Sequence, residues 1–152
     1  MKHGHATAST YHPWRMLRTD WAHVELEHTD DIPCGRLADT NGIDHIRMRR
    51  RLYQVERRCA LAHELIHLER GNTGECSPAL QAEASREAAR WLIPWEQLLA
   101  AVRWSRGESE LADELWVTVP ILRARTGALR AVELMEIAFA VHDAHYIMPG
   151  DE

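Results

Sequence analysis

The sequence is poor in lysine and in long apolar runs, and each shortage disfavours a class of protein. Lys2 is the only lysine, so arginine carries almost all of the basic charge, and the formal net charge is -5. A general nucleic-acid-binding protein would have a basic excess, so direct nucleic-acid binding is disfavoured. No stretch approaches the roughly 20 apolar residues of a membrane span. The amino terminus, MKHGHATAST, lacks the apolar core of a secretory signal. We therefore expect a cytoplasmic protein with no membrane partner.

Cysteine is also scarce, with only Cys34, Cys59 and Cys76 present. Their odd number and their spacing match neither a disulfide framework nor a cysteine metal motif, which favours reduced thiols. At 152 residues the chain is one domain's worth of sequence. That length is sufficient for a hydrophobic core without disulfide support.

The hydrophobic pattern of the first third of the chain predicts a small sheet. We expect residues 1–10, which are small and polar, to be disordered. A short helix should follow over residues 13–18, with Pro13 in its first turn. Alternating polarity predicts a strand at 21–27, and two more strands are expected at 35–39 and 45–48, separated by the turn dipeptide Asn41-Gly42. We interpret these three strands as an antiparallel sheet.

From about Leu52 the periodicity becomes helical and continues to Arg70, with Gly71 and Asn72 at the position of a C-cap. After Pro78 only helices are predicted, over residues 79–92, 95–103, 108–115, 120–126 and 129–141. The predicted fold class is therefore α+β, with the small sheet packed on the helix of residues 52–70 and an all-helical C-terminal part.

We divide the chain into a disordered N-terminus (1–10), a core (11–104) and a helical extension (105–152) that packs on the core. The extension contains LADELWVTVPILRARTGAL, which has the spacing of a helix-turn-helix unit.

Residues 57–71, RRCALAHELIHLERG, contain the pattern His-Glu-x-x-His as His63, Glu64 and His67. Residues four apart lie on one face of a helix, so His63 and His67 can bind one zinc ion. Glu64 would lie at the edge of the same site, where it can act as the general base toward water activated by the metal. The flanking residues are apolar, so these three side chains should be buried, and buried polar groups need partners. Zinc would provide them.

A catalytic zinc ion needs a third protein ligand, and the next predicted helix offers two glutamates. Glu83 and Glu87 are one turn apart in QAEASREAARWLIP, among small residues that permit close approach. Glu83 as the ligand and Glu87 as a partner of a ligand histidine would complete a His-His-Glu site, although a solvent-exposed helix face also explains them. Spacing alone does not decide between the two glutamates.

Three segments together resemble the ImmA/IrrE family of zinc metallopeptidases, in the form found in actinobacteria and their phages. These are RRCALAHELIHLERG, EASREAARWLIP and LADELWVTVPILRART, and the resemblance extends from about Ile46 to Thr126. It implies a gluzincin-like, zincin-type core over residues 11–104. It also implies His63, His67 and Glu83 as zinc ligands and Glu64 as the catalytic residue. The sequence departs from the family pattern at Ser85, where Asn or Asp is usual, and at Glu87, where an aromatic residue is usual.

The resemblance further implies a site-specific endopeptidase that cuts a regulatory protein, expected to be a helix-turn-helix repressor, in phage, mobile-element or stress regulation. The alternative is a non-catalytic regulator that binds a repressor or antitoxin partner, with zinc structural or absent. Glu64 favours the enzyme, because a purely structural zinc site does not need it.

Overall fold

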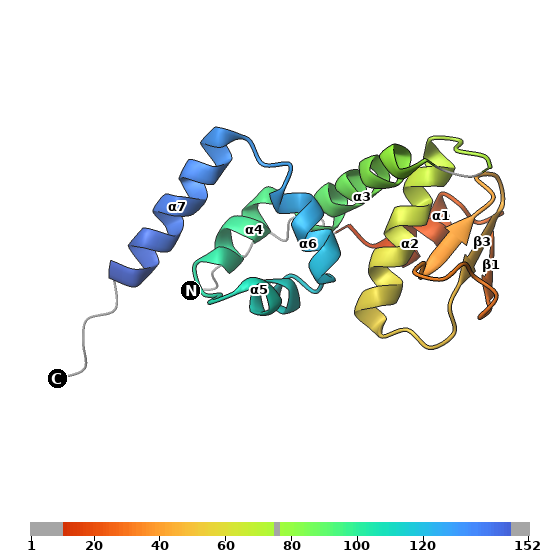
Figure 1. Cartoon of the computed structure of the whole chain (residues 1–152), viewed down its shortest axis with the longest axis horizontal. Helices are drawn as coiled ribbons and strands as arrows, with labels where there is room; N and C mark the ends of the chain where they lie inside the picture. Colours follow the sequence, from red (N-terminus) through yellow and green to blue (C-terminus); the bar gives the residue numbers. More distant parts are fainter. Residues whose placement is uncertain (1–10, 75–76, 147–152) are drawn as a thin grey trace, which may run out of the picture.

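The structure is a computed structural model that describes residues 11–74 and 77–146. The sheet, α1 and α2 form one half of an elongated molecule, and α4 to α7 form the other half, with α3 between them (Figure 1). Residues 1–10, predicted to be disordered, lie outside the described part. The elements are α1 (Pro13–Thr19), β1 (Glu25–His28), β2 (Ala38–Thr40), β3 (His45–Met48), α2 (Gln54–Glu69), α3 (Pro78–Leu92), α4 (Trp95–Val102), α5 (Glu108–Glu114), α6 (Val119–Thr126) and α7 (Ala131–Tyr146).

The fold class is α+β, as predicted, with a small three-stranded sheet and a mostly helical remainder. The hairpin predicted around Asn41 and Gly42 is confirmed, because β2 pairs antiparallel with β3. The Asn41 Oδ1 atom accepts hydrogen bonds from the backbone N–H groups of residues 43, 44 and 45 at 2.9–3.0 Å. Gly42 has a φ of +75°, in the left-handed region that favours glycine.

The prediction of a wholly antiparallel sheet is wrong. The strand order is β1-β3-β2, and β1 pairs with β3 in parallel, with Leu26 opposite Ile46. Alternating polarity identifies a strand but contains no information about its direction. Here the long connection after β1 brings the chain back across the sheet before β2 begins. Arg49 stabilises this connection, because its side chain donates hydrogen bonds to the backbone oxygens of Arg36 at 2.6 Å and Ile32 at 2.9 Å.

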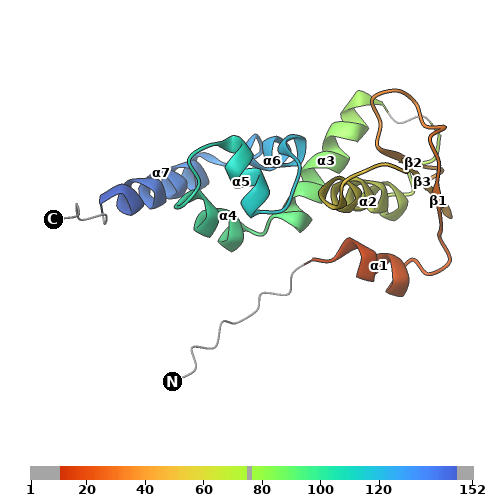
Figure 2. The same ribbon diagram turned by 90° about the horizontal axis from the view of Figure 1, so that it is seen from below.

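Helix α2 lies between two hydrophobic clusters, as expected for a helix that is apolar nearly all round. Figure 2 shows α2 with α1 below it, the strands to its right and α3 above it to the left. The sheet-side cluster combines Ile46 and Met48 with Leu61 and Leu65 of α2. The helix-side cluster contains α2 residues such as Ile66, together with α3, α4, α5 and α6.

Residues typical of helix termini mark the C-terminal end of α2 and the start of α3. Gly71, with a φ of +62°, ends α2, and its backbone N–H donates to the Leu68 oxygen at 3.1 Å. Ser77 caps α3 by accepting a hydrogen bond from the Leu80 N–H at 3.3 Å, and Pro78 occupies the first turn. These two ends place the C-terminal half of α2 beside the N-terminal half of α3.

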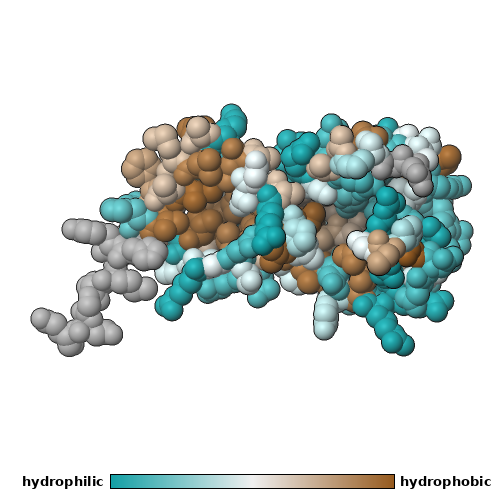
Figure 3. Space-filling view, viewed as in Figure 1, coloured by the Kyte–Doolittle hydropathy of each residue, from teal (hydrophilic) through white to brown (hydrophobic). Residues whose placement is uncertain are grey.

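The last helix, α7, packs against α4 and leaves apolar side chains exposed. The most exposed of them, Phe139 and Met135, are 64% and 60% accessible. Figure 3 shows the corresponding brown area over the half of the molecule that holds α4 and α7. Among the helices of residues 11–74 and 77–146, none is long and apolar enough to cross a membrane.

The domain division at residue 104 stays a prediction. The helix-side cluster contains residues from both sides of it, such as Leu98 and Leu122. Cys34 is exposed and Cys59 is buried, and both are free, while Cys76 lies outside the described residues.

Candidate metal centre

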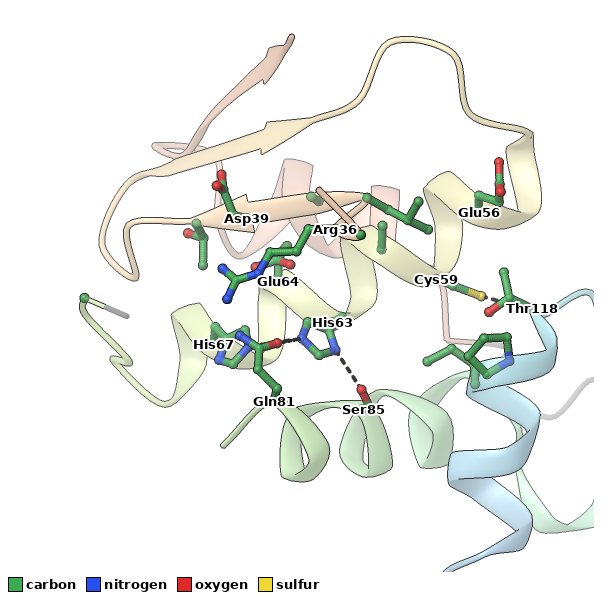
Figure 4. A pocket seen from close by; sticks show the side chains of 18 residues that line it. Arg36, Asp39, Glu56, Cys59, His63, Glu64, His67, Gln81, Ser85 and Thr118 are labelled. Atoms are coloured by element: carbon green, nitrogen blue, oxygen red, sulfur yellow. Dashed lines mark hydrogen bonds between the residues drawn. The ribbon is translucent and has the colours of Figure 1, made fainter. Parts of the chain in front are cut away.

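A pocket of about 430 Å³ lies where β2, α2, α3 and the start of α6 meet. Its walls contain the two histidines and the glutamate of the motif (Figure 4). The segment before β2 and the strand itself form one wall, and α3 forms the opposite wall. The lining residues that the site argument uses are Arg36, Asp39, His63, Glu64, His67, Gln81 and Ser85.

The two histidines of α2 direct their Nε2 atoms toward each other. The distance between His63 Nε2 and His67 Nε2 is 3.1 Å. On the other side of each ring, Nδ1 contacts a polar side chain. Ser85 Oγ lies 3.2 Å from His63 Nδ1, and Asn72 Nδ2 lies 3.1 Å from His67 Nδ1. These contacts fix the ring orientations, as partners of metal-binding histidines do.

A third polar atom joins the pair from α3. The Gln81 Oε1 atom lies 2.7 Å from His63 Nε2 and 3.4 Å from His67 Nε2. In Figure 4, Gln81 and Ser85 both point from α3 toward His63. Two ring nitrogens and one amide oxygen thus converge on one point.

Burial keeps both imidazoles neutral near pH 7. It lowers the pKa of His63 to about 4, against the opposing effect of the hydrogen bond with Gln81. It also lowers the pKa of His67 below the ordinary histidine value, again opposed by Gln81. A neutral imidazole has one unprotonated ring nitrogen, which is the form that binds a metal.

Glu64 lies beside the histidines, on the side of α2 that faces β2. The residue is only 6% exposed. Burial, with a smaller contribution from the nearby Asp39 carboxylate, raises the pKa of its carboxyl to about 8 against the opposing effect of Arg36. Figure 4 shows Arg36 extending from the segment before β2 toward the space above Glu64 and His67. The protonation of Glu64 therefore depends on the charges around the pocket.

The two glutamates of α3 do not contact the histidines. Glu83 Oε2 accepts a hydrogen bond from Arg70 at 3.2 Å, and its side chain is 49% exposed. Glu87 accepts a hydrogen bond from the Trp91 indole at 3.2 Å and pairs with Arg90 and Arg70. Within residues 11–74 and 77–146, no three His, Cys, Asp or Glu side chains come together as a metal-binding group. The assignment of Glu83 as a zinc ligand stays a prediction.

Sequence reasoning identified His63, Glu64 and His67 but not Arg36, Asn72 or Gln81. Gln81 was detectable in principle, because it shares a helix face with Ala84, Ser85 and Ala88 at a spacing of three to four residues. No comparable local signal marks Arg36 or Asn72, whose roles depend on tertiary packing.

No family model matches this chain, and no curated protein or solved structure matches it either.

Proposed function

We propose that this protein is a zinc-dependent endopeptidase of the ImmA/IrrE type, with a zincin-like core, that cuts a regulatory protein in the cytoplasm. One observation carries the proposal: the Nε2 atoms of His63 and His67 converge at 3.1 Å in a pocket that also contains the buried Glu64. The three motif segments that resemble the family support the same assignment.

The residues present fit a zinc ion. His63 Nε2, His67 Nε2 and Gln81 Oε1 are mutually within 3.4 Å. Ser85 Oγ can accept a hydrogen bond from a His63 ring protonated on Nδ1, which would leave the His63 Nε2 lone pair available, whereas the Asn72 Nδ2 atom donates to His67 Nδ1. A zinc ion would satisfy all three atoms together.

When bound, zinc would supply Lewis acidity toward a peptide carbonyl and a water molecule. The chain's own residues account for the remaining steps. His63 and His67 hold the metal, and their Nδ1 contacts keep both rings in position. Glu64 takes a proton from the attacking water and passes it to the amine nitrogen that leaves when the peptide bond breaks. Burial raises the pKa of Glu64 in the metal-free chain, and Arg36 opposes that effect and so favours the ionised form that a base requires.

The pocket also suits an extended peptide. Strand β2 lies at one edge of the sheet and lines the pocket through Ala38, Asp39 and Thr40. A strand at a sheet edge can pair with an incoming extended chain through backbone hydrogen bonds. We expect the substrate to be a helix-turn-helix repressor, which the family resemblance implies. Direct nucleic-acid binding stays disfavoured because of the acidic net charge.

The second candidate function is a non-catalytic regulator that binds a repressor or antitoxin partner, with zinc structural or absent. One observation favours it: no acidic side chain joins the histidine pair within the described part of the chain. A site without a charged third ligand holds zinc less tightly, and a binding protein would tolerate that.

The variant Glu64→Gln tests the choice between these functions. The substitution keeps the size of the side chain but removes the base. We expect it to fold, to bind zinc and to bind its partner, yet to cut at least about a hundredfold more slowly, which is the lower end of general acid-base contributions. The measurement is co-expression with helix-turn-helix repressors as candidate substrates, followed by mass spectrometry of the fragments.

The matched control is Glu69→Gln, the same chemical change on an exposed residue of α2. It should cut at the wild-type rate. Unchanged cutting by Glu64→Gln would refute the mechanism. A wild-type protein that binds its partner tightly and leaves it intact would instead support the regulator.

A further inference from the structure

The side-chain amide of Gln81 lies beside the histidine pair, where a third metal ligand would be expected. Gln81 Oε1, from α3, lies within hydrogen-bonding distance of both Nε2 atoms, at 2.7 Å from that of His63 and 3.4 Å from that of His67. Zinc sites of the type proposed above complete their ligand set with a carboxylate. This chain instead places an uncharged glutamine there.

The face that α3 turns toward α2 explains the placement. Ala84 and Ala88 are 0% exposed and belong to the cluster that also contains Ala62 and Ile66 of α2. These small side chains allow the two helices to approach closely. Gln81 and Ser85 lie on the same face, at the end nearest the histidines, and both contact His63. The packing of α3 therefore fixes where Gln81 points.

The same packing of α3 directs Glu83 away from His63 and His67. Successive helical residues are about 100° apart, so Glu83 lies about 200° around α3 from Gln81. Its ion pair with Arg70 and its 49% exposure agree with that position. To bring Glu83 to the histidines, α3 would have to rotate by roughly half a turn, and Ala84 and Ala88 would leave the core.

We propose that Gln81 supplies the third protein donor of the zinc site through its side-chain amide oxygen. This inference rests on the proposed zinc site. An amide oxygen can bind a metal but adds no negative charge, so the attraction for a dication is weaker than that of a carboxylate. The site is thus a His-His-Gln set, whose zinc affinity is limited by residue 81.

Zinc affinity of four variants tests the proposal, measured by competition with a fluorescent chelator on the full chain. Gln81→Glu restores a carboxylate and should bind zinc roughly tenfold or more tightly than wild type. Gln81→Ala should bind at least about tenfold more weakly. Glu83→Gln is the matched control and should stay within about twofold of wild type. His63→Ala should lose the site altogether.

Cobalt provides a second readout that does not depend on activity. The visible absorption of bound Co²⁺ reports its ligands, so it should change between wild type and Gln81→Glu and stay the same in Glu83→Gln. Circular dichroism of each metal-free variant shows whether it has folded. If Gln81→Ala does not fold, the comparison of Gln81→Glu with Glu83→Gln still decides the question.

The possible failures are distinguishable. If His63→Ala binds zinc as well as wild type does, the proposed metal site itself is wrong. If His63→Ala loses zinc while Gln81→Ala and Gln81→Glu keep the wild-type affinity, the site stands and Gln81 is not a ligand. Loss of zinc in Glu83→Gln, with Gln81→Ala unaffected, would assign the third position to Glu83.

Discussion

At the scale of single residues, Glu64 links the candidate site to the stability of the protein. A buried carboxyl group loses its hydration when it ionises, and burial is the main reason for its pKa of about 8. The folded metal-free chain therefore holds a proton on Glu64 that the unfolded chain releases near the ordinary value of 4.5. Ionisation of this group favours unfolding.

The sign of the resulting pH dependence follows from linkage. Between the unfolded and folded pKa values, the folded state binds one more proton than the unfolded state, so the free energy of unfolding falls as pH rises. We expect Glu64→Gln to remove this contribution. Between about pH 5 and about pH 8, the free energy of unfolding of metal-free wild type should fall relative to that of metal-free Glu64→Gln by on the order of 3 kcal/mol.

Urea unfolding of chelator-treated protein across this pH range measures the effect. His63 and His67 also titrate abnormally, but both variants contain them, so the difference between the variants isolates Glu64. Glu69→Gln should follow the wild-type curve. Parallel curves for wild type and Glu64→Gln would mean that Glu64 is not held in its protonated form.

Some residues of the candidate site could be predicted from the sequence, and others could not. His63, Glu64 and His67 form a short motif within a helix, so their common face follows from helix geometry alone. Gln81 and Asn72 come from other segments, and their approach depends on how α3 and the end of α2 pack. A polar residue in an amphipathic helix has many possible roles, and only the tertiary contacts select one.

At the scale of elements, the turn between β2 and β3 contacts the segment that ends α2. A Cβ atom at Gly42 would lie 2.1 Å from the backbone oxygen of Asn72. Asn72 in turn contacts His67 Nδ1 through its side chain at 3.1 Å. Gly42, 30 positions before Asn72 in the sequence, thus helps to hold a partner of the proposed metal ligand His67.

We expect Gly42→Ala to affect both stability and metal binding. The new methyl group must displace the backbone at Asn72, and the left-handed φ adds strain, for a total cost of about 2–3 kcal/mol. Displacement of Asn72 should weaken zinc binding roughly tenfold or more, as loss of a ligand's partner does. Urea unfolding and chelator competition measure the two effects.

Gly35→Ala is the matched control. Gly35 has a φ of +84°, but a Cβ atom there would have nothing within 4 Å. It should therefore show only the cost of the backbone strain, about 1 kcal/mol, with zinc affinity close to that of wild type. Equal zinc affinities in the two variants would indicate that the turn does not support the metal site.

The elements themselves were largely predictable, because helical and alternating patterns are local properties of the sequence. The helix containing the motif and the β2–β3 hairpin both follow from short-range signals such as Gly71 and Asn41-Gly42. The parallel pairing of β1 did not, because it depends on the path of residues 29–37 and on hydrogen bonds such as that from Arg49 to Arg36. Such long-range contacts have no period in the sequence.

At the scale of the whole molecule, α2 connects the two hydrophobic clusters. Leu61 and Leu65 belong to the sheet-side cluster, and Ala62 and Ile66 to the helix-side cluster. Neither cluster can come apart without exposing apolar surface of α2. In contrast, α7 packs mainly on α4 and has exposed residues such as Phe139. Its attachment involves much less of the core.

This arrangement predicts unequal rates of amide hydrogen exchange. The amides of α2 around Leu61 and Ile66 should exchange only through global unfolding, because no partial opening frees them. The amides of α7 should exchange faster, through local opening. Exchange measured by mass spectrometry on peptides from the two helices checks this. Equal protection of both helices would contradict the picture of a peripheral α7.

The central position of α2 also determines which amide exchange rates a bound metal would change. A ligand that binds only the folded state makes global unfolding less favourable by the same free energy wherever that unfolding is detected. Zinc should therefore slow exchange by one common factor throughout α2, on the side of the sheet as well as on the side of the site. It should leave the exchange of α7 unchanged, because the opening of α7 would not release the metal.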